Sequence, residues 1–335
     1  MPARTYSGRL GTIGDEQFQA ALDHFALGRL IATTPITRGL FGQNVFLQTS
    51  VGSFVLRGSP HDATQLHHER CVCRLLHERT GIPVPWPYLI DESATIFGWS
   101  YALMPRMPGI HIDDASRPLL GPADGTAIAQ AMGMTLAQLG DVEGPAGAYD
   151  RASDGIVPDP SAGFDAERWI RGCVADANAF DPATFNPHRD WVDGIIMRGL
   201  EALERSCPTT LTTSDFGEGN AVVQKHADGR WHVSGIFDFY EYGMGDLERA
   251  LCRPLFGYLA QSPALALAFL RGYAQRRPLR PFARERLAFY ALGDRFIIWN
   301  YGHSQAPWFP PELGFRDFAE PALRQIDDVL VQVGS

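Results

Sequence analysis

The segment Leu211–Glu248 most strongly constrains what this chain can fold into, because it places two apolar runs between polar loops. Asp215 follows a short β-prone run, and Asn220 comes five positions later. The two apolar runs are joined by a turn at His226–Gly229, and the second run ends at Asp238. This pattern predicts a β-hairpin with two carboxylates and an amide at its strand ends, within a region of otherwise helical pattern.

Phosphoryl transfer is the chemistry that suits these residue types, because a protein catalyses it mainly by positioning groups and supplying cations. A carboxylate at Asp215 can orient an acceptor hydroxyl and take its proton. The amide oxygen of Asn220 and the carboxylate of Asp238 can bind magnesium. Alternatively, Asp215 and Asn220 are ordinary turn residues and Asp238 caps a helix. The joint spacing around the hairpin favours the metal–phosphate site.

The same segment resembles the catalytic core of the aminoglycoside phosphotransferase and choline kinase-like families, which share the protein kinase fold. Their catalytic loop reads His-Gly-Asp, four residues and Asn, and Thr213–Asn220 (TSDFGEGN) occupies it here. Their magnesium motif is similar to Ile236–Phe239 (IFDF) followed by Gly245 and Asp246. The match is specific around this core, although the resemblance extends over most of the chain.

This resemblance implies Asp215 as the catalytic base and Asn220 and Asp238 as magnesium ligands. It also implies that Asp246 braces the catalytic loop, a role that is compatible with capping the next helix. The family histidine is replaced by Thr213, which bears on the rigidity of the loop and on the rate rather than on the type of reaction.

The N-terminal part of the chain supports the same interpretation. The run Phe54–Arg57 (FVLR) resembles the third strand of the family, whose basic residue binds the α- and β-phosphates. Arginine stands at that position instead of lysine, so the charge is kept while its shape becomes a planar fork. Glu69 on the next helix is expected to pair with Arg57. A surface cation and a solvated helix face are the alternatives for these two residues.

Two further elements are expected to contact the nucleotide. The turn Arg38–Asn44 contains Gly39 and Gly42, which would let backbone amides approach phosphate, although an ordinary hairpin turn has the same composition. The stretch around Met104 and Met107 resembles the linker between lobes, where adenine bonds to backbone groups. Prolines in that stretch lack amide hydrogens, so any contact must use the remaining amides.

The overall pattern predicts an α+β, bilobal protein kinase-like fold. Residues 1–104 form an ATP-binding lobe with a leading helix, 105–109 form a hinge, and 110–335 form a mostly helical lobe. Strands are expected at Leu30–Thr34, Asn44–Thr49, Ser53–Arg57, Trp86–Ile90 and Trp99–Met104. Helices are expected at Thr12–Gly28, Thr64–Arg79, Pro122–Leu139, Asp165–Phe180, Asp190–Arg205, Asp246–Ala260, Pro263–Gln275 and Ala283–Tyr301. Residues 141–165 are expected to form a loop.

Composition and charge indicate which binding partners and which cellular location to expect for this protein. The formal net charge is −9 and no basic patch is evident, which argues against nucleic acid as a partner. No run of 18 or more apolar residues occurs, so no membrane span is predicted. The N-terminus lacks an apolar signal region, and the five cysteines form no regular framework, so a cytoplasmic location is expected. The oligomeric state is not predicted.

Three classes of function are therefore open. The first is an O-phosphotransferase that uses ATP and Mg²⁺ to phosphorylate a hydroxyl of a small molecule, such as an aminoglycoside-like antibiotic, a sugar or an amino alcohol. The second is a weakly active or inactive nucleotide-binding homologue, suggested by Thr213 and Arg57. The third is a protein kinase, which the short separation of Asp238 from Asp246 disfavours, because no long activation segment fits there.

Overall fold

The computed structural model describes residues 3–36, 42–112, 116–150, 152–159, 164–180, 186–205, 209–305, 310 and 313–334. The chain divides into two compact units. The first unit contains the residues up to Gly109 together with Tyr149–Val157 and Ser234–Tyr240, and the second unit contains the remainder. Asp238 therefore belongs to the first unit, whereas Asp215 and Asn220 belong to the second.

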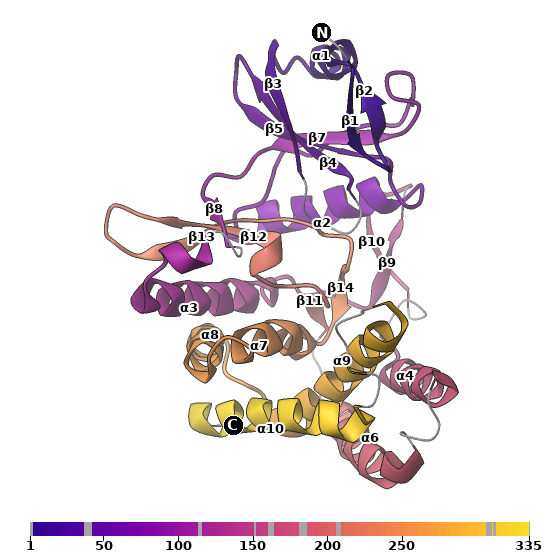
Figure 1. Cartoon of the computed structure of the whole chain (residues 1–335), viewed down its shortest axis with the longest axis vertical. Coiled ribbons are helices and arrows are strands. Elements are labelled where there is room, and N and C mark those ends of the chain that lie inside the picture. Colours follow the sequence, from indigo (N-terminus) through magenta and orange to yellow (C-terminus); the bar gives the residue numbers. More distant parts are fainter. Residues whose placement is uncertain are drawn as a thin grey trace. The chain divides into compact units, whose positions relative to one another are not determined.

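The first unit is built on a five-stranded antiparallel sheet with the strand order β3-β4-β5-β7-β6 (Figure 1). Its strands are β3 (Leu30–Pro35), β4 (Asn44–Thr49), β5 (Ser53–Gly58), β6 (Leu89–Asp91) and β7 (Tyr101–Pro105). A separate hairpin, two helices and most of a second hairpin complete the unit: β1 (Arg4–Ser7), β2 (Gly11–Ile13), α1 (Asp15–His24), α2 (Gln65–Arg79), β9 (Gly147–Asp150) and β10 (Gly155–Pro158). These bounds agree with the strands and the long helix expected from the sequence, except that β6 and β7 begin later.

The two faces of this sheet have different roles because side chains alternate along each strand. One face packs against α1 and the first hairpin, and its core includes Val45, Leu47, Leu56, Leu103, Phe18 and Leu22. In the sheet register, Asn44, Arg57 and Ala102 lie opposite one another, as do Phe46, Val55 and Met104. Arg57 therefore shares the second face with a row of mainly apolar side chains.

The start of the leading helix differs from the expectation. Gly14 is the N-cap of α1, and its amide donates a hydrogen bond to Gln17 Oε1. Thr12, where the leading helix was expected to begin, lies in β2 and pairs with Thr5 of β1. The sequence did not indicate this hairpin because Arg4–Ser7 and Gly11–Ile13 are short and only partly apolar.

The second unit is mainly helical. Its helices are α3 (Pro122–Leu139), α4 (Ala166–Phe180), α6 (Arg189–Glu204), α7 (Cys252–Leu259), α8 (Pro263–Arg276), α9 (Ala283–Gln305) and α10 (Phe315–Val333), with short 3₁₀ segments at Arg117–Leu119, Asn186–His188, Glu218–Asn220 and Leu247–Leu251. Its strands are β8 (Ile110–His111), β11 (Thr210–Thr213), β12 (Ala221–Lys225), β14 (Tyr242–Gly245) and the first half of β13 (Trp231–Ile236). No described helix is long and apolar enough to cross a membrane.

Several elements of the chain were not expected from the sequence. The stretch 141–165, which the composition assigned to a loop, contains the hairpin β9–β10. Strand β14 pairs antiparallel with β11, so that Thr213 lies opposite Tyr242. Helix α10 has an apolar face with Phe315, Ile326 and Leu330 buried, although Pro321 interrupts its sequence.

Helices α3 and α8 approach each other closely at two glycines. A methyl group added at Gly133 would lie 1.9 Å from the carbonyl oxygen of Phe269, and one added at Gly272 would lie 2.1 Å from that of Gln130. Only residues without a Cβ allow this backbone contact. The contact joins α3 and α8 as a closely packed pair within the second unit, which also contains the catalytic-loop motif.

Replacing Gly133 with alanine is expected to destabilise the second unit by roughly 1–3 kcal/mol or more, because the methyl group must displace a backbone carbonyl. Gly172→Ala in α4 is the matched control, because its added methyl meets no atom within 4 Å. That variant should gain up to about 1 kcal/mol from the better helix propensity of alanine. Urea denaturation followed by circular dichroism compares the two, and equal stability would contradict the close contact.

Candidate active site

Arg57 and Glu69 form a buried ion pair in the first unit. Nη2 of Arg57 lies 2.7 Å from Oε1 of Glu69, and the two side chains are 10% and 2% exposed. Strand β5 carries the arginine and helix α2 the glutamate, as the sequence indicated. Glu69 also accepts hydrogen bonds from Gln65 Nε2 at 2.9 Å and from the Tyr88 hydroxyl at 2.8 Å. Its carboxylate is therefore fixed by three donors, two of which the motif analysis missed.

The same nitrogen of Arg57 also reaches Asp238. Nη2 of Arg57 lies 3.0 Å from Oδ1 of Asp238, whose side chain is 38% exposed. Burial opposes the charge of Arg57, but the carboxylates of Glu69 and Asp238 outweigh it and raise the pKa of the guanidinium. Both contacts use Nη2, and the buried Nε has no hydrogen-bond partner among the described residues. The guanidinium thus keeps donor capacity for an anion.

Asp238 itself has an unusual backbone. Its φ of 65° lies in the left-handed region, which is uncommon for a residue other than glycine. Non-glycine residues in this region concentrate at functional sites, where the surrounding structure compensates for the strain. The preceding strand is attached to the first unit through the amide of Ile236, which donates to the carbonyl of Pro83 at 3.0 Å.

The sheet face that carries Arg57 offers an apolar surface. Phe46 and Val55 are half-buried, while Ala102 and Met104 are buried. The guanidinium of Arg106 lies over the Phe46 ring, 3.9 Å from its centroid. The arrangement suits the flat face of a heterocycle, since cations and aromatic rings both stack well.

The linker residues differ in what their amides can do. The amide of Arg106 donates to the Ser53 carbonyl at 2.9 Å, so it is already used within the sheet. Met104 lies within β7, opposite Val55. Met107 follows the strand and is half-buried. If a nucleotide bonds to backbone amides in the stretch Met104–Met107, as the sequence predicts, it must use amides other than that of Arg106.

The glycine turn is only partly described. Gly39 lies outside the described residues. Gly42 has a φ of +57°, and a Cβ at this position would lie 2.9 Å from that of Ser7. Its carbonyl accepts a hydrogen bond from the Ser7 hydroxyl at 2.6 Å. The positive φ and the packing against β1 therefore favour glycine here, and contact with phosphate stays a prediction.

Asp215 and Asn220 come together in the second unit, just after β11. Nδ2 of Asn220 donates to Oδ2 of Asp215 at 3.0 Å and to the backbone carbonyl of Asp215 at 2.9 Å. Because both donor bonds come from Nδ2, the amide oxygen of Asn220 is turned away from Asp215. The 3₁₀ turn Glu218–Asn220 gives the loop this closed shape. The Asn220 amide thus orients the Asp215 carboxylate through its nitrogen, and its oxygen points away from that carboxylate.

Two neighbours complete the surroundings of Asp215. The Thr213 hydroxyl accepts a hydrogen bond from the amide of Asp215 at 3.0 Å. On the other side, Nη1 of Arg253 lies 3.0 Å from Oδ1 of Asp215, whose side chain is 39% exposed. Burial opposes the charge of Arg253, but Asp294 and Asp215 outweigh it and raise its pKa. Arg253 lies in α7, far along the chain from the loop, and no sequence signal marks it.

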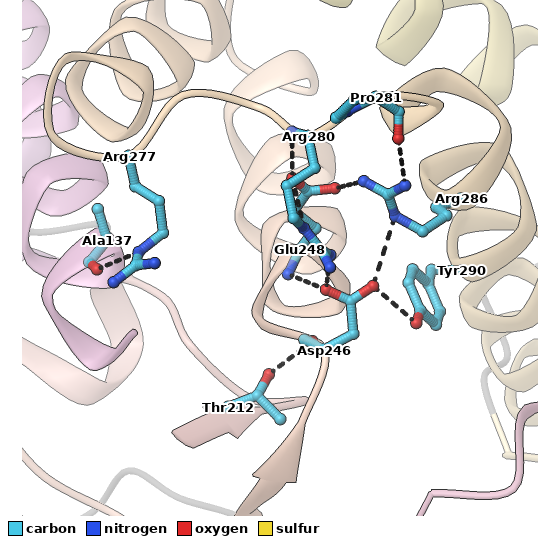
Figure 2. A network of polar contacts seen from close by, with 9 residues as sticks. All are labelled: Ala137, Thr212, Asp246, Glu248, Arg277, Arg280, Pro281, Arg286 and Tyr290. Carbon is cyan, nitrogen blue, oxygen red and sulfur yellow. Dashed lines mark hydrogen bonds and ion pairs between the residues drawn. The ribbon is translucent and has the colours of Figure 1, made fainter. Parts of the chain in front are cut away.

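Figure 2 shows a polar network around Asp246, which Thr212 of β11 joins. Asp246 is the N-cap of the following 3₁₀ segment, since its Oδ1 accepts from the Glu248 amide at 3.0 Å. The Thr212 hydroxyl donates to the Asp246 carbonyl at 3.1 Å. Arg280 and Tyr290 both contact the Asp246 carboxylate. Asp246 therefore caps the 3₁₀ segment with its side chain and contacts β11 through its backbone carbonyl.

The predicted site residues therefore form two groups. In the first unit the structure brings together Arg57, Glu69 and Asp238, and in the second unit it brings together Asp215 and Asn220. The described residues contain no group of three or more His, Cys, Asp or Glu side chains arranged as a metal site. Binding of magnesium by Asn220 and by Asp238 stays a prediction.

Two related proteins match this chain over very different lengths. Homoserine kinase of Caulobacter sp. (strain K31) is 26% identical over 302 residues, which cover 85% of each protein. Acyl-CoA dehydrogenase family member 11 of Gallus gallus is 34% identical over 99 residues, 28% of this chain. The match spans only 12% of the length of that larger protein.

Solved structures share the fold at low sequence identity. The GDP and kanamycin complex of APH(2″)-IIIa gives a TM-score of 0.60 at 12% identity, covering 95% of this chain and 99% of that chain. Choline kinase LicA from Streptococcus pneumoniae gives a TM-score of 0.55 at 13% identity, covering 95% and 99%. These likenesses confirm the predicted α+β, bilobal protein kinase-like fold class.

The family match is the most direct finding. A model of the phosphotransferase enzyme family matches residues 32–290, which include both groups of predicted site residues. The match confirms the resemblance drawn from the motif around Asp215 and the prediction of an enzyme that transfers phosphoryl groups. The chain belongs to the phosphotransferase enzyme family.

Proposed function

We propose that this enzyme transfers the γ-phosphoryl group of ATP to a hydroxyl of a small molecule, with Mg²⁺ as the metal. The observation that carries the proposal is the pairing of Asp215 with Asn220, in which the amide fixes the carboxylate and turns its own oxygen outward. That geometry gives one oriented acceptor for a hydroxyl proton and one neutral oxygen ligand beside it. An ordinary turn would not need both.

Each residue then has a defined role. Asp215 orients the acceptor hydroxyl and takes its proton as the new bond to phosphorus forms. Arg57, stabilised by Glu69, binds the phosphates that do not transfer. Asn220 and Asp238 offer the hard oxygen ligands that magnesium prefers. When bound, the metal neutralises charge on the phosphates, which is its main contribution in this reaction class.

Both departures from the family pattern are accommodated by the structure. Thr213 replaces the motif histidine, and its hydroxyl accepts the amide hydrogen of Asp215, so the loop keeps a side-chain support. Arg57 replaces the usual lysine and still pairs with Glu69. We therefore favour an active enzyme over the inactive nucleotide-binding homologue.

The related proteins include a homoserine kinase, a choline kinase and an enzyme bound to kanamycin, so amino alcohols and aminoglycosides are the first classes to test. Glu218 within the catalytic loop is paired with Arg117, whereas Glu241 is exposed and accepts from the Ser214 hydroxyl at 3.1 Å. Glu241 is thus the better placed of the two to attract a cationic acceptor.

The deciding experiment measures magnesium-dependent consumption of ATP, and of GTP in parallel, with a panel of acceptors. The panel contains homoserine, choline, kanamycin, hygromycin B and simple sugars, and phosphorylated product is identified by mass spectrometry. Turnover by wild type with at least one acceptor supports the proposal. Nucleotide binding without turnover of any acceptor would favour a binding-only protein.

Asp238→Ala is expected to weaken binding of magnesium–nucleotide by about tenfold or more, because a metal carboxylate ligand is lost. Affinity for nucleotide in EDTA should change much less. Asp23→Ala is the matched control, since Asp23 is an exposed carboxylate on α1. Calorimetric titration with and without Mg²⁺ separates these effects, and equal magnesium dependence in both variants would refute the metal assignment.

A further inference from the structure

The hairpin β9–β10 is the feature that the proposed function leaves unexplained. In the sequence it lies between α3 and α4, yet its residues Tyr149–Val157 belong to the first unit. The same unit contains α2, the helix that carries Glu69. A segment distant in sequence has therefore become part of the unit that contains Arg57.

Asp154 makes the polar contacts between this hairpin and α2. Its Oδ1 accepts from Arg70 Nη2 at 2.9 Å, and its Oδ2 accepts from Arg74 Nη1 at 2.8 Å. A second nitrogen of Arg74 donates to the Asp154 backbone carbonyl. Arg70 and Arg74 lie one helical turn apart, so one carboxylate bridges two successive turns of the helix.

The backbone and a side chain of the hairpin orient the Asp154 carboxylate. Asp154 has a φ of 48°, in the left-handed region. The Tyr149 hydroxyl donates to Oδ1 of Asp154 at 2.9 Å, which orients the carboxylate from within the hairpin. Asp150 closes the turn itself by accepting from the amide and the hydroxyl of Ser153 at 2.9 Å and 2.7 Å. Two aspartates of one hairpin thus have separate tasks, one internal and one directed at α2.

The position of α2 matters because Glu69 immediately precedes Arg70. Glu69 is 1% exposed and must face Arg57, Gln65 and Tyr88 for its bonds to form. A small rotation or shift of α2 would move this carboxylate away from Arg57. The ion pairs to Asp154 are only about one-third exposed and join charged groups, so they resist such a movement better than surface pairs.

We propose that Asp154 is a positioning residue for the nucleotide site: by bridging Arg70 and Arg74 it fixes helix α2 so that Glu69 meets Arg57. This inference rests on the proposed function for its effect on nucleotide binding, while the bridging itself is independent of that function. Its described contacts reach α2 and its own hairpin, so its effect on nucleotide binding is expected to act through the Arg57–Glu69 pair.

The test compares Asp154→Asn with Asp150→Asn in the full chain. Asp154→Asn keeps the size of the side chain but removes its charge, and Asp150→Asn does the same for the carboxylate whose described contacts lie within the turn. Hydrogen exchange of the amides in α2 should accelerate by about tenfold in Asp154→Asn and remain as in wild type in Asp150→Asn. Affinity for nucleotide should fall by about threefold to tenfold in the first variant only, with the KM of the acceptor unchanged.

Further variants separate positioning from general damage. Asp154→Glu should restore part of the nucleotide affinity because it restores the charge. Arg74→Gln should reproduce the faster exchange in α2 if Asp154→Asn proves too unstable to purify. Unchanged exchange in α2 in both Asp154→Asn and Arg74→Gln would overturn the inference, even if nucleotide binds well. Failure of wild type to bind any nucleotide would instead refute the proposed function, and the exchange data would still decide whether Asp154 fixes α2.

Discussion

Asp215→Ala is expected to lower kcat by about two orders of magnitude or more, as is typical for loss of a positioned general base. Nucleotide affinity should stay nearly intact, because Asp215 contacts Asn220 and Arg253 in the second unit rather than any predicted phosphate ligand. Single-turnover kinetics with a saturating acceptor would measure the chemical step, and calorimetry would measure nucleotide binding.

The matched control for this prediction is Asp228→Ala. Asp228 lies in the turn between β12 and β13, where its carboxylate contacts Arg230 at 2.8 Å. It carries the same charge as Asp215 in the same unit but has no contact with the catalytic loop motif, so kcat should match wild type. A kcat for Asp215→Ala within about threefold of this control would rule out a role as catalytic base.

Arg286→Met is expected to destabilise the second unit by about 3–5 kcal/mol, the usual cost of breaking a buried ion pair from one side. Arg286 and Glu248 are each 1% exposed and contact each other directly. Arg286 also donates to the Pro281 carbonyl at 2.5 Å and lies 3.6 Å from Oδ2 of Asp246 (Figure 2). Removing the guanidinium leaves the Glu248 carboxylate with the amide and the side chain of Arg280 as partners.

Arg284→Met is the control for this stability measurement. Arg284 lies on the same helix and pairs with Asp327 through two bonds of 2.6 Å, but it is solvent-exposed. An exposed pair is screened by water, so its loss should barely shift the urea midpoint. In the double variant Glu248→Gln with Arg286→Met, the combined loss should be smaller than the sum of the single losses, since no unpaired buried charge remains. Equal midpoints for Arg284→Met and Arg286→Met would contradict the buried network.

Local signals in the sequence were sufficient for the elements with strong periodicity. Helix α3 begins and ends where Pro122 and Leu139 predicted, and β4 spans Asn44–Thr49 as expected. The pair Arg57–Glu69 was also expected and is present, and Asp215 and Asn220, both singled out by their motif, lie in contact. These features depend on residues that are close in sequence, or on a motif whose spacing is itself the signal.

Elements whose partners lie far away in sequence could not be anticipated in the same way. Strand β14 is only four residues long and exists because β11 supplies its hydrogen bonds. The hairpin that contains Asp154 is rich in Gly, Pro and Asp, which favours a loop unless its contact with α2 is known. Arg253 is an ordinary helical arginine until folding places its guanidinium beside Asp215.

The sequence by itself determined the family, the fold class and the identity of the polar residues at the ends of β11 and β13, because residue type and short-range spacing suffice for these. Only the tertiary structure decided which neighbours contact the functional groups. Tyr88 and Gln65 bond to Glu69, Arg253 bonds to Asp215, and Asp154 bonds to an arginine of α2. Side-chain hydrogen bonds and ion pairs require atoms within a few ångströms of one another. The number of residues between two side chains in the sequence does not give the distance between their atoms in the folded protein.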